Sequence, residues 1–587
     1  MITEKIEQLL NDAAKKIGLS DSLTVSFSNM PKLCDFQCND CFKLAKTAGL
    51  APLELAEKIV ANLEKDGDFY FEAVKPAFIN IKLTDQGFEK LGQTILSSEN
   101  CGLEKHKNGQ RVILDYGGAN IAKTLHVGHL RPAIIGEAIK RLYQQLGDSV
   151  ISDVHLGDWG LQLGLTELQL FEDGVLDFYF GKSDKPAEIT LEMLNEAYPK
   201  ASTRSKVDDV FREKAEEWTL KIQKKEQPYF DIYKKIKDAS VPKIKANYQA
   251  LGAQFDEWYG ESDSSDYVDE AIAIIEKKGL LHESDGAMVV DVATENENIP
   301  LPKADPQEPQ RYKNPMPPAI IKKSNGAVLY ATTDIATILM RNKLHNNPDR
   351  IEYITDQRQA MHFTQVFRVC KLSGISPENQ QLLHIGHGTM NGKDGKPFKT
   401  REGGTLKLED MINLLIEKAG EKLKSNGQEF DRDLALKIGV AAMKFGDLIN
   451  NVGKDYVFDL DKFLSFEGKT GPYLQYTAVR INSILAKVEN VKEGQFKVYS
   501  DDERDILRAA VRQLSSYEVC YKEKSLAALC ASTFDLASAF STFYNNHSVI
   551  GETDEEKKSS FVQLLKMVKK LLAQALHVLA IEVPEKM

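Results

Sequence analysis

The stretch that decides the fold is RVILDYGGANIAKTLHVGHLR, residues 111–131. It opens with a short apolar run that ends in two glycines, and it continues into a helical pattern from Gly128 to Leu146. A second apolar run, residues 150–154, follows directly. Strand, glycine turn, helix and strand form a βαβ unit, the building block of a parallel nucleotide-binding sheet. Further strands are predicted at residues 288–292, 351–355 and 382–385.

The segments around this unit have other patterns. Residues 1–108 combine a helical opening with two short alternating runs, at Leu23–Phe27 and Ile79–Leu83, which predict a small α+β domain. Within residues 109–430, the charged helical stretch 161–245 is expected to be an insertion. Residues 431–587 are helical throughout, with helices predicted at 434–450, 471–488, 503–521 and 559–581. The predicted architecture is therefore a multidomain α/β protein, with a Rossmann-type parallel-sheet catalytic domain between an α+β N-terminal domain and an all-helical C-terminal domain.

Composition limits the class of protein. The chain has 587 residues, of which 42% are hydrophobic and 27% charged, as in ordinary globular proteins. It shows no apolar run long enough to span a membrane and no signal peptide. Seven cysteines, an odd count, predict reduced thiols and a cytoplasmic location. The net charge of −11 argues against nucleic-acid binding on its own, although phosphate contacts depend on local basic patches.

Two histidines, His126 and His129, flank Val127–Gly128 where a loop enters the predicted helix. A helix N-terminus presents free N–H groups and a partial positive charge, which suit a phosphate. Gly128 allows close approach of a nucleotide, both histidines can donate hydrogen bonds to phosphate oxygens, and Lys123 adds a point charge. The alternative is a zinc pair, which a bare HxxH without a nearby third ligand supports only weakly. No metal site is therefore predicted.

The motif HVGH resembles the HIGH signature of class I aminoacyl-tRNA synthetases. The longer run from Asn120 to Arg131, together with the GDWG of residues 157–160, resembles the arginyl-tRNA synthetases in particular. The resemblance covers nearly the whole chain, including its last residues, 581–587. It implies that His126, His129 and Lys123 are catalytic and that the first two bind ATP together with Gly128.

A second class I signature, a mobile basic loop usually written KMSKS, has its counterpart in GKDGKPFKTREGG, residues 392–404. This glycine-bracketed loop with four cations could close over a triphosphate. One register keeps Lys399 as the second lysine of the signature, whereas a register anchored on Thr400–Arg401 puts Glu402 there. We favour the second register, in which Lys123 replaces the missing lysine. We expect Lys399 to be catalytic and to bind ATP together with Arg401. The other possibilities are an exposed charged hairpin and a Walker A loop at 468–470, which lacks its required glycine.

The amino-acid pocket is predicted from acidic and aromatic residues. A guanidinium presents five donors in a planar fork, so its pocket needs carboxylates at fixed geometry. Tyr330 and Asp334 lie on one face if that segment is helical, and they resemble the arginyl motif that holds the guanidinium. The resemblance adds further pocket positions at Glu261, Gln359, Asn120 and Gln162. Taken singly, each acidic residue is more often a solvated surface charge, so the prediction depends on their shared placement in the family motifs.

The helical C-terminal segment contains GPYLQYTAVR, residues 471–480. Tyr473, Tyr476 and Arg480 recur on one helix face. Aromatic rings can stack on unpaired bases and Arg can neutralise the backbone, whereas the alternative is an aromatic stripe that packs the helical bundle. The family resemblance favours a tRNA-binding face at the anticodon loop.

One motif points elsewhere. Cys34, Cys38 and Cys41 have the spacing of a radical-SAM iron–sulfur site. That chemistry needs a long βα barrel downstream, which the short distance to HVGH does not allow. We therefore predict a helix with small apolar cysteines, with zinc binding as an unsupported alternative.

Together these features predict an enzyme that activates L-arginine with ATP and Mg²⁺ and transfers it to tRNA(Arg), acting as a monomer. A class I synthetase for glutamate or glutamine is the first alternative, and the acidic residues Glu261 and Asp334 argue against it. A non-catalytic RNA-binding relative is the second, and the intact HVGH argues against that.

Overall fold

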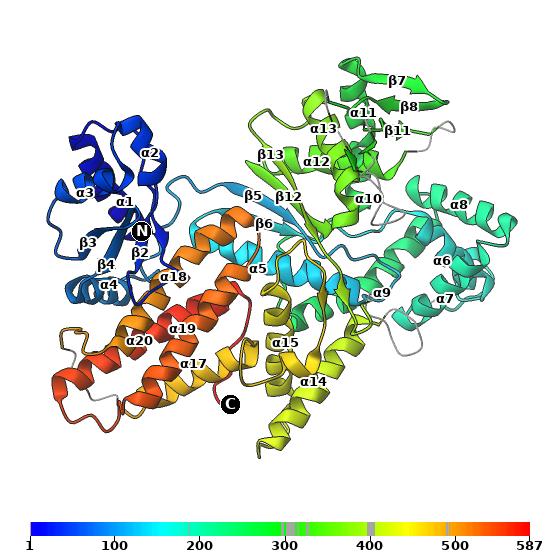
Figure 1. Ribbon diagram of the computed structural model, residues 1–587. Helices are drawn as coiled ribbons and strands as arrows, with labels where there is room; N and C mark the ends of the chain where they lie inside the picture. The colour runs from blue at the N-terminus through cyan, green and yellow to red at the C-terminus, as the bar shows by residue number, and fades with distance from the viewer. Residues whose placement is uncertain are drawn as a thin grey trace. The chain divides into compact units, whose positions relative to one another are not determined.

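The computed structural model describes residues 2–186, 188–294, 297, 299–300, 312–313, 316–323, 328–395, 406–488, 491 and 494–587. Figure 1 shows the helices and strands of the chain. The chain divides into two compact units. Unit 1 consists of residues 1–106, 441–449 and 461–587, and unit 2 of residues 107–440 and 450–460.

Unit 2 is built on a parallel sheet of four strands. These are β5 (Arg111–Asp115), β6 (Ser149–Asp153), β12 (Arg350–Asp356) and β13 (Gln381–His387). They run in the order β13-β12-β5-β6, and every neighbouring pair is parallel. The predicted Rossmann-type sheet is confirmed. Because the strand order reverses between β5 and β12, the crevice for a ligand lies at the carboxyl ends of these two strands.

Helices cover both faces of the sheet. On one face α11 (Val268–Lys277), α12 (Tyr330–Leu344) and α13 (Ala360–Ser373) bury a core that includes Ile351 and Tyr353 of β12. Glu352 lies between those two residues and accepts a hydrogen bond at 2.8 Å from Tyr143 of α5 (Leu130–Leu146). Side chains alternate along a strand, so α5 covers the opposite face.

The charged stretch after β6 forms the expected helical insertion. Its helices are α6 (Leu161–Glu172), α7 (Leu191–Arg204), α8 (Asp209–Gln223) and α9 (Tyr229–Ala250). The strand predicted at residues 288–292 forms β8 (Ala287–Val290), but it belongs to a separate antiparallel sheet with β7 (Leu281–Ser284) and β11 (Ala319–Lys322). The reason is local: Asp285 and Gly286 both have positive φ, at 51° and 76°, which closes a tight hairpin between β7 and β8.

Unit 1 contains the small α+β fold expected at the N-terminus. Its antiparallel sheet has the order β1-β2-β4-β3, formed by β1 (Ser26–Phe27), β2 (Phe36–Cys38), β3 (Phe69–Val74) and β4 (Phe78–Leu83). The accompanying helices are α1 (Ile2–Lys16), α2 (Cys41–Ala48), α3 (Pro52–Ala61) and α4 (Asp85–Ser97).

The C-terminal helices of unit 1 are α17 (Gly471–Leu485), α18 (Asp501–Glu523), α19 (Ala527–Asn546) and α20 (Glu555–Val578). Helix α19 was not among the predicted helices. The N-terminal segment packs directly on this bundle: Arg508 of α18 donates to Asp35 at 2.6 Å, and Lys570 of α20 donates to the carbonyl oxygens of Leu96 and Ser98 at 2.8 Å. Across the described part of the chain, no helix combines the length and apolarity that crossing a membrane requires.

The cysteine motif does not lie on one helix, so that prediction is wrong. Cys38 ends β2, Cys41 begins α2, and Cys34 precedes β2. The break arises because Asn39 and Asp40 leave the strand to start a new helix at Cys41. All three thiols are buried, and burial raises the pKa of Cys38 to about 12 and of Cys41 to about 11. Cys38 and Cys41 therefore pack as small apolar core residues.

Candidate active site

The HVGH segment turns sharply after β5, at the switch point of the sheet. His126 precedes a short 3₁₀ turn, η1 (Val127–His129), which leads into α5. The ring of His126 folds back so that its Nδ1 accepts a hydrogen bond from the backbone N–H of Gly128 at 3.0 Å. A Cβ at position 128 would lie 2.7 Å from that ring. Gly128 is therefore required for the position of His126.

The two histidines form a neutral donor pair. Their ring centroids are 4.0 Å apart, and the backbone N–H of His126 donates to Nδ1 of His129 at 3.1 Å. Burial lowers the pKa of His126, with the charge of Lys123 adding to the effect. Burial also lowers the pKa of His129 to about 3. Because Nδ1 of His126 accepts a hydrogen bond, its neutral ring holds the proton on Nε2, where it can be donated to a ligand.

The segments on either side of the basic loop are both anchored by backbone hydrogen bonds, and one of them reaches the HVGH segment. Before it, β14 (Met390–Asn391) pairs in parallel with β15 (Tyr456–Val457). After it, the carbonyl oxygen of Leu406 accepts from Val127 N–H at 3.0 Å, and Leu408 N–H donates to the carbonyl oxygen of Leu125 at 2.8 Å. The loop thus returns to the backbone of the HVGH segment itself. Lys399 and Arg401, together with Glu402, lie outside the described residues, so both registers of the loop remain predictions.

Lys123 approaches the histidine pair from the preceding loop. Ala122 has a positive φ of 59°, and its N–H donates to Ser240 of α9 at 3.0 Å. The ammonium group of Lys123 lies 4.2 Å from the centre of the Tyr198 ring on α7. The helical insertion thus holds this cation, and a cation–π contact leaves its charge available to a phosphate.

Three predicted pocket residues come together in space. Glu261 begins α10 (Glu261–Ser264), Tyr330 begins α12, and Asp334 follows one turn later. Helices α10 and α12 pack against each other, which brings the Tyr330 hydroxyl close to the Glu261 carboxyl group. Burial raises the pKa of Glu261 to about 7, with the charges of Asp158 and Asp334 adding to the effect and His155 opposing it. A cation would therefore be strongly favoured beside these two carboxyl groups.

The other three predicted pocket residues lie along the same carboxyl edge without a direct contact to this group in the described structure. Asn120 forms a β-bridge to Gly157, where a Cβ would lie 2.0 Å from the Asn120 amide oxygen. The Gln162 side chain donates to the carbonyl oxygen of Ile121. Gln359 ends η4 (Gln357–Gln359), directly after β12, and is exposed.

Sequence reasoning missed His155 and His362. His155 comes two residues after β6, has φ of 38°, and lies 3.4 Å from the hydroxyl of Thr337 on α12. Nε2 of His362, on α13, lies 2.5 Å from a carboxylate oxygen of Asp334. Both could have been found from the sequence. His155 lies just beyond the carboxyl end of a predicted strand, and His362 lies three residues after Gln359.

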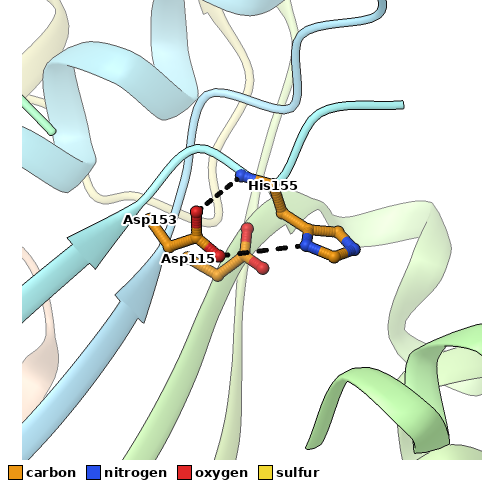
Figure 2. A group of neighbouring side chains, drawn as sticks. All are labelled: Asp115, Asp153 and His155. Carbon is orange, nitrogen blue, oxygen red and sulfur yellow. Dashed lines mark hydrogen bonds and ion pairs between the residues drawn. The ribbon is translucent and has the colours of Figure 1, made fainter. Parts of the chain in front are cut away.

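Sequence reasoning also missed a buried arginine, Arg341, on the same helix as Tyr330 and Asp334. Arg341 of α12 donates to Asp115 at 2.6 Å and to Asp153 at 2.7 Å. Figure 2 shows the two aspartates, at the ends of β5 and β6, directed toward a common space with His155 beside them. Among the described residues, only these three side chains are arranged closely enough to suggest a metal site. The Arg341 guanidinium already supplies the cation between the two carboxylates, so we assign this cluster to structure.

The three predicted tRNA-binding residues on α17 have unlike surroundings. The hydroxyl of Tyr473 lies 3.0 Å from that of Ser541 on α19. Tyr476 is 42% exposed. The guanidinium of Arg480 stacks on the ring of Tyr544 at 4.0 Å. Tyr473 is therefore part of the packing of the bundle, whereas Tyr476 is open to a partner.

Known proteins with similar sequences identify the class. Residues 92–460 match the model of the tRNA synthetases class I (R) catalytic domain, residues 2–83 the arginyl tRNA synthetase N terminal domain, and residues 474–587 the DALR anticodon binding domain. Together with the parallel sheet and its HVGH turn, these matches define a class I aminoacyl-tRNA synthetase.

Individual relatives are more specific. An arginine–tRNA ligase of Agathobacter rectalis is 41% identical over 96% of this chain and 96% of its own length. One of Alkaliphilus oremlandii is 40% identical over the full length of both chains. The chain belongs to the arginyl-tRNA synthetase family.

Solved structures share the fold. The arginyl-tRNA synthetase of Plasmodium falciparum superposes with a TM-score of 0.80 at 24% identity, covering 100% of this chain and 99% of that one. That of Thermus thermophilus gives a TM-score of 0.78 at 20% identity and covers both chains fully.

Proposed function

We propose that the chain activates L-arginine with ATP and transfers the arginyl group to tRNA(Arg), using the site at the carboxyl ends of β5 and β12. The observation that supports this most directly is that Glu261, Tyr330 and Asp334 come together where α10 packs against α12, so that their charges act on one another. A guanidinium is a planar cation with five donors, and two carboxyl groups with a phenolic oxygen offer matching acceptors.

Two group transfers make up the reaction. A carboxylate oxygen of arginine attacks the α-phosphorus of ATP, and the bond to pyrophosphate breaks, which gives arginyl-adenylate. A hydroxyl of the terminal ribose of tRNA then attacks the arginyl carbonyl carbon and loses its proton, and AMP leaves with the bonding electrons. Mg²⁺ arrives with ATP as part of the substrate and balances phosphate charge.

The side chains at the HVGH turn align and stabilise the phosphates. Neutral His126 and His129 donate N–H groups without adding charge, and the cations Lys123, Lys399 and Arg401 balance the charge that develops on pyrophosphate. The contact between the Lys123 ammonium group and the Tyr198 ring supports this role for Lys123, because it holds the cation in place. The anchoring of Leu406 on Val127 supports a basic loop that acts on the same phosphates.

The tRNA partner completes the proposal. We divide the chain into an elbow-binding segment, residues 1–108, a catalytic segment, 109–430, and an anticodon-binding segment, 431–587. The match of residues 474–587 to an anticodon binding domain supports the last of these.

We propose that the enzyme is located in the cytoplasm and acts as a monomer. A mass near 65.7 kDa in light scattering would support the monomer, and about twice that mass would contradict it.

The test of the site is arginine-dependent ATP–pyrophosphate exchange in the presence of tRNA. We expect His126→Ala and His129→Ala to slow exchange by the equivalent of about 2–4 kcal/mol each, because they remove donors that act mainly in the transition state. Lys123→Ala should cost as much as Lys399→Ala if the second register of the loop is right.

The matched control is His282→Ala, in β7, whose partner Asp291 is 73% exposed; its exchange rate should stay normal. Normal exchange in both His126→Ala and His129→Ala would contradict the active-site assignment. Exchange with each of the twenty amino acids separates arginine from glutamate and glutamine, whose anionic or neutral side chains would gain nothing from two carboxyl groups.

A further inference from the structure

His362 contacts the guanidinium pocket from a second helix. Its Nε2 lies 2.5 Å from Oδ2 of Asp334, and the two side chains are only 26% and 15% exposed. His362 comes from the first turn of α13, whereas Asp334 comes from α12. The contact therefore fixes a carboxylate of one helix through a donor on the next.

The imidazole ring of His362 is held in this position by aromatic neighbours. It meets the ring of Tyr330 edge-on at 5.9 Å and the ring of Phe363 at 5.3 Å. Phe363 is buried and stacks in turn on His384 of β13 at 4.8 Å. A donor that is locked by packing costs little conformational entropy when the substrate binds.

We propose that His362 is a positioning residue that sets the arginine specificity of this enzyme. By donating to Oδ2, it fixes the rotation of the Asp334 carboxylate and leaves Oδ1 for the substrate guanidinium. Its ring also contacts the ring of Tyr330, whose hydroxyl lies close to Glu261. One histidine thus contacts two of the three acceptor groups of the pocket, the Asp334 carboxylate and the Tyr330 ring. This inference rests on the proposed assignment of Asp334 to the guanidinium.

Two substitutions separate the hydrogen bond from the packing. His362→Phe keeps an aromatic ring against Tyr330 and Phe363 but removes the donor to Asp334. His362→Gln keeps a donor of similar reach and removes the ring. We expect His362→Phe to raise the KM for arginine about tenfold, the usual effect of losing one hydrogen bond to a charged group, with the KM for ATP unchanged. His362→Gln should recover most of that loss.

Asp334→Asn and the double variant complete a cycle. If the two side chains act together, His362→Phe should add little to the rise in arginine KM that Asp334→Asn already causes. The melting temperature of each variant shows whether it is folded, and His282→Phe serves as the surface control.

The outcomes are distinct. An unchanged arginine KM in folded His362→Phe, or an equal rise in the KM values for arginine and ATP, overturns the role of His362. An additive effect in the double variant overturns it as well. If Asp334→Asn itself leaves the arginine KM unchanged, the proposed pocket is wrong instead.

Discussion

Glu261 is the pocket residue whose charge depends most on its surroundings. Burial raises its pKa to about 7, and neighbouring carboxylates add to the effect. Before arginine binds, Glu261 is therefore half protonated near neutral pH. A bound guanidinium favours the ionised form, so arginine binding should expel a proton.

The pH dependence of arginine binding follows from this. Because a raised carboxyl pKa means that protonation competes with the substrate, the dissociation constant for arginine should rise as pH falls below about 7, approaching tenfold per pH unit. Calorimetric titration between pH 6 and 8, in two buffers of different ionisation enthalpy, measures both affinity and proton release. In Glu261→Gln binding should be weaker and much less dependent on pH. A wild-type affinity that is flat over this range would contradict the assignment.

Helix α12 is the element that aligns the pocket. It has Tyr330 and Asp334 at its start and Arg341 in its second half. The buried guanidinium of Arg341 joins α12 to the ends of both β5 and β6. The helix is thereby fixed against the carboxyl ends of β5 and β6.

Removing this anchor should be costly. Arg341→Met leaves Asp115 and Asp153 buried without their cation, which typically destabilises a protein by about 3–5 kcal/mol. We expect a lower melting temperature and a higher KM for arginine, because α12 loses its alignment. The control is Arg358→Ala, a side chain 84% exposed beside Asp356; a surface pair contributes less than about 1 kcal/mol. Similar melting temperatures for the two variants would show that Arg341 does not anchor α12.

The two tyrosines of helix α17 have different surroundings. Tyr473 packs on α19, whereas Tyr476 is exposed. Tyr473→Ala should lower the melting temperature. Tyr476→Ala should leave the melting temperature unchanged and weaken tRNA use by about 1–3 kcal/mol, the usual value of one base stack. The measurements are thermal unfolding and tRNA KM on both variants. Unchanged tRNA KM in Tyr476→Ala would remove this residue from the proposed tRNA surface.

On the scale of the whole molecule, the two ends of the chain share one compact unit. Arg508 of α18 meets Asp35 of the N-terminal segment at 2.6 Å, and the Asp35 side chain is only 4% exposed. Arg504 meets Asp85 at the same distance, but that carboxylate is 59% exposed. The first pair is therefore the stronger attachment, because solvent screens the second.

This difference can be measured by hydrogen exchange. Arg508→Ala leaves a buried carboxylate unpaired, so amide exchange in residues 1–106 should become faster. Arg504→Ala should change it little. Faster exchange in both variants, or in neither, would show that the Arg508–Asp35 pair does not hold this segment.

Local patterns were sufficient for much of this protein. The short apolar runs and the helical spacing around GGAN and HVGH predicted β5, α5 and β6, because such patterns are properties of consecutive residues. The same stretch indicated His126, Gly128, His129 and Lys123 by their position at a helix N-terminus. The helical insertion and most of the C-terminal helices were likewise visible as periodic patterns.

Contacts between distant segments were decided by the tertiary structure alone. The three cysteines appeared helical because their spacing is short, yet a strand and a helix divide them. Met288–Val292 has the pattern of a buried strand, but its hairpin turn assigns it to another sheet. Arg341, His155 and His362 act on residues 28 to 226 positions away. No local period encodes such pairings, because they depend on which elements pack together and on which charges burial leaves in need of a partner.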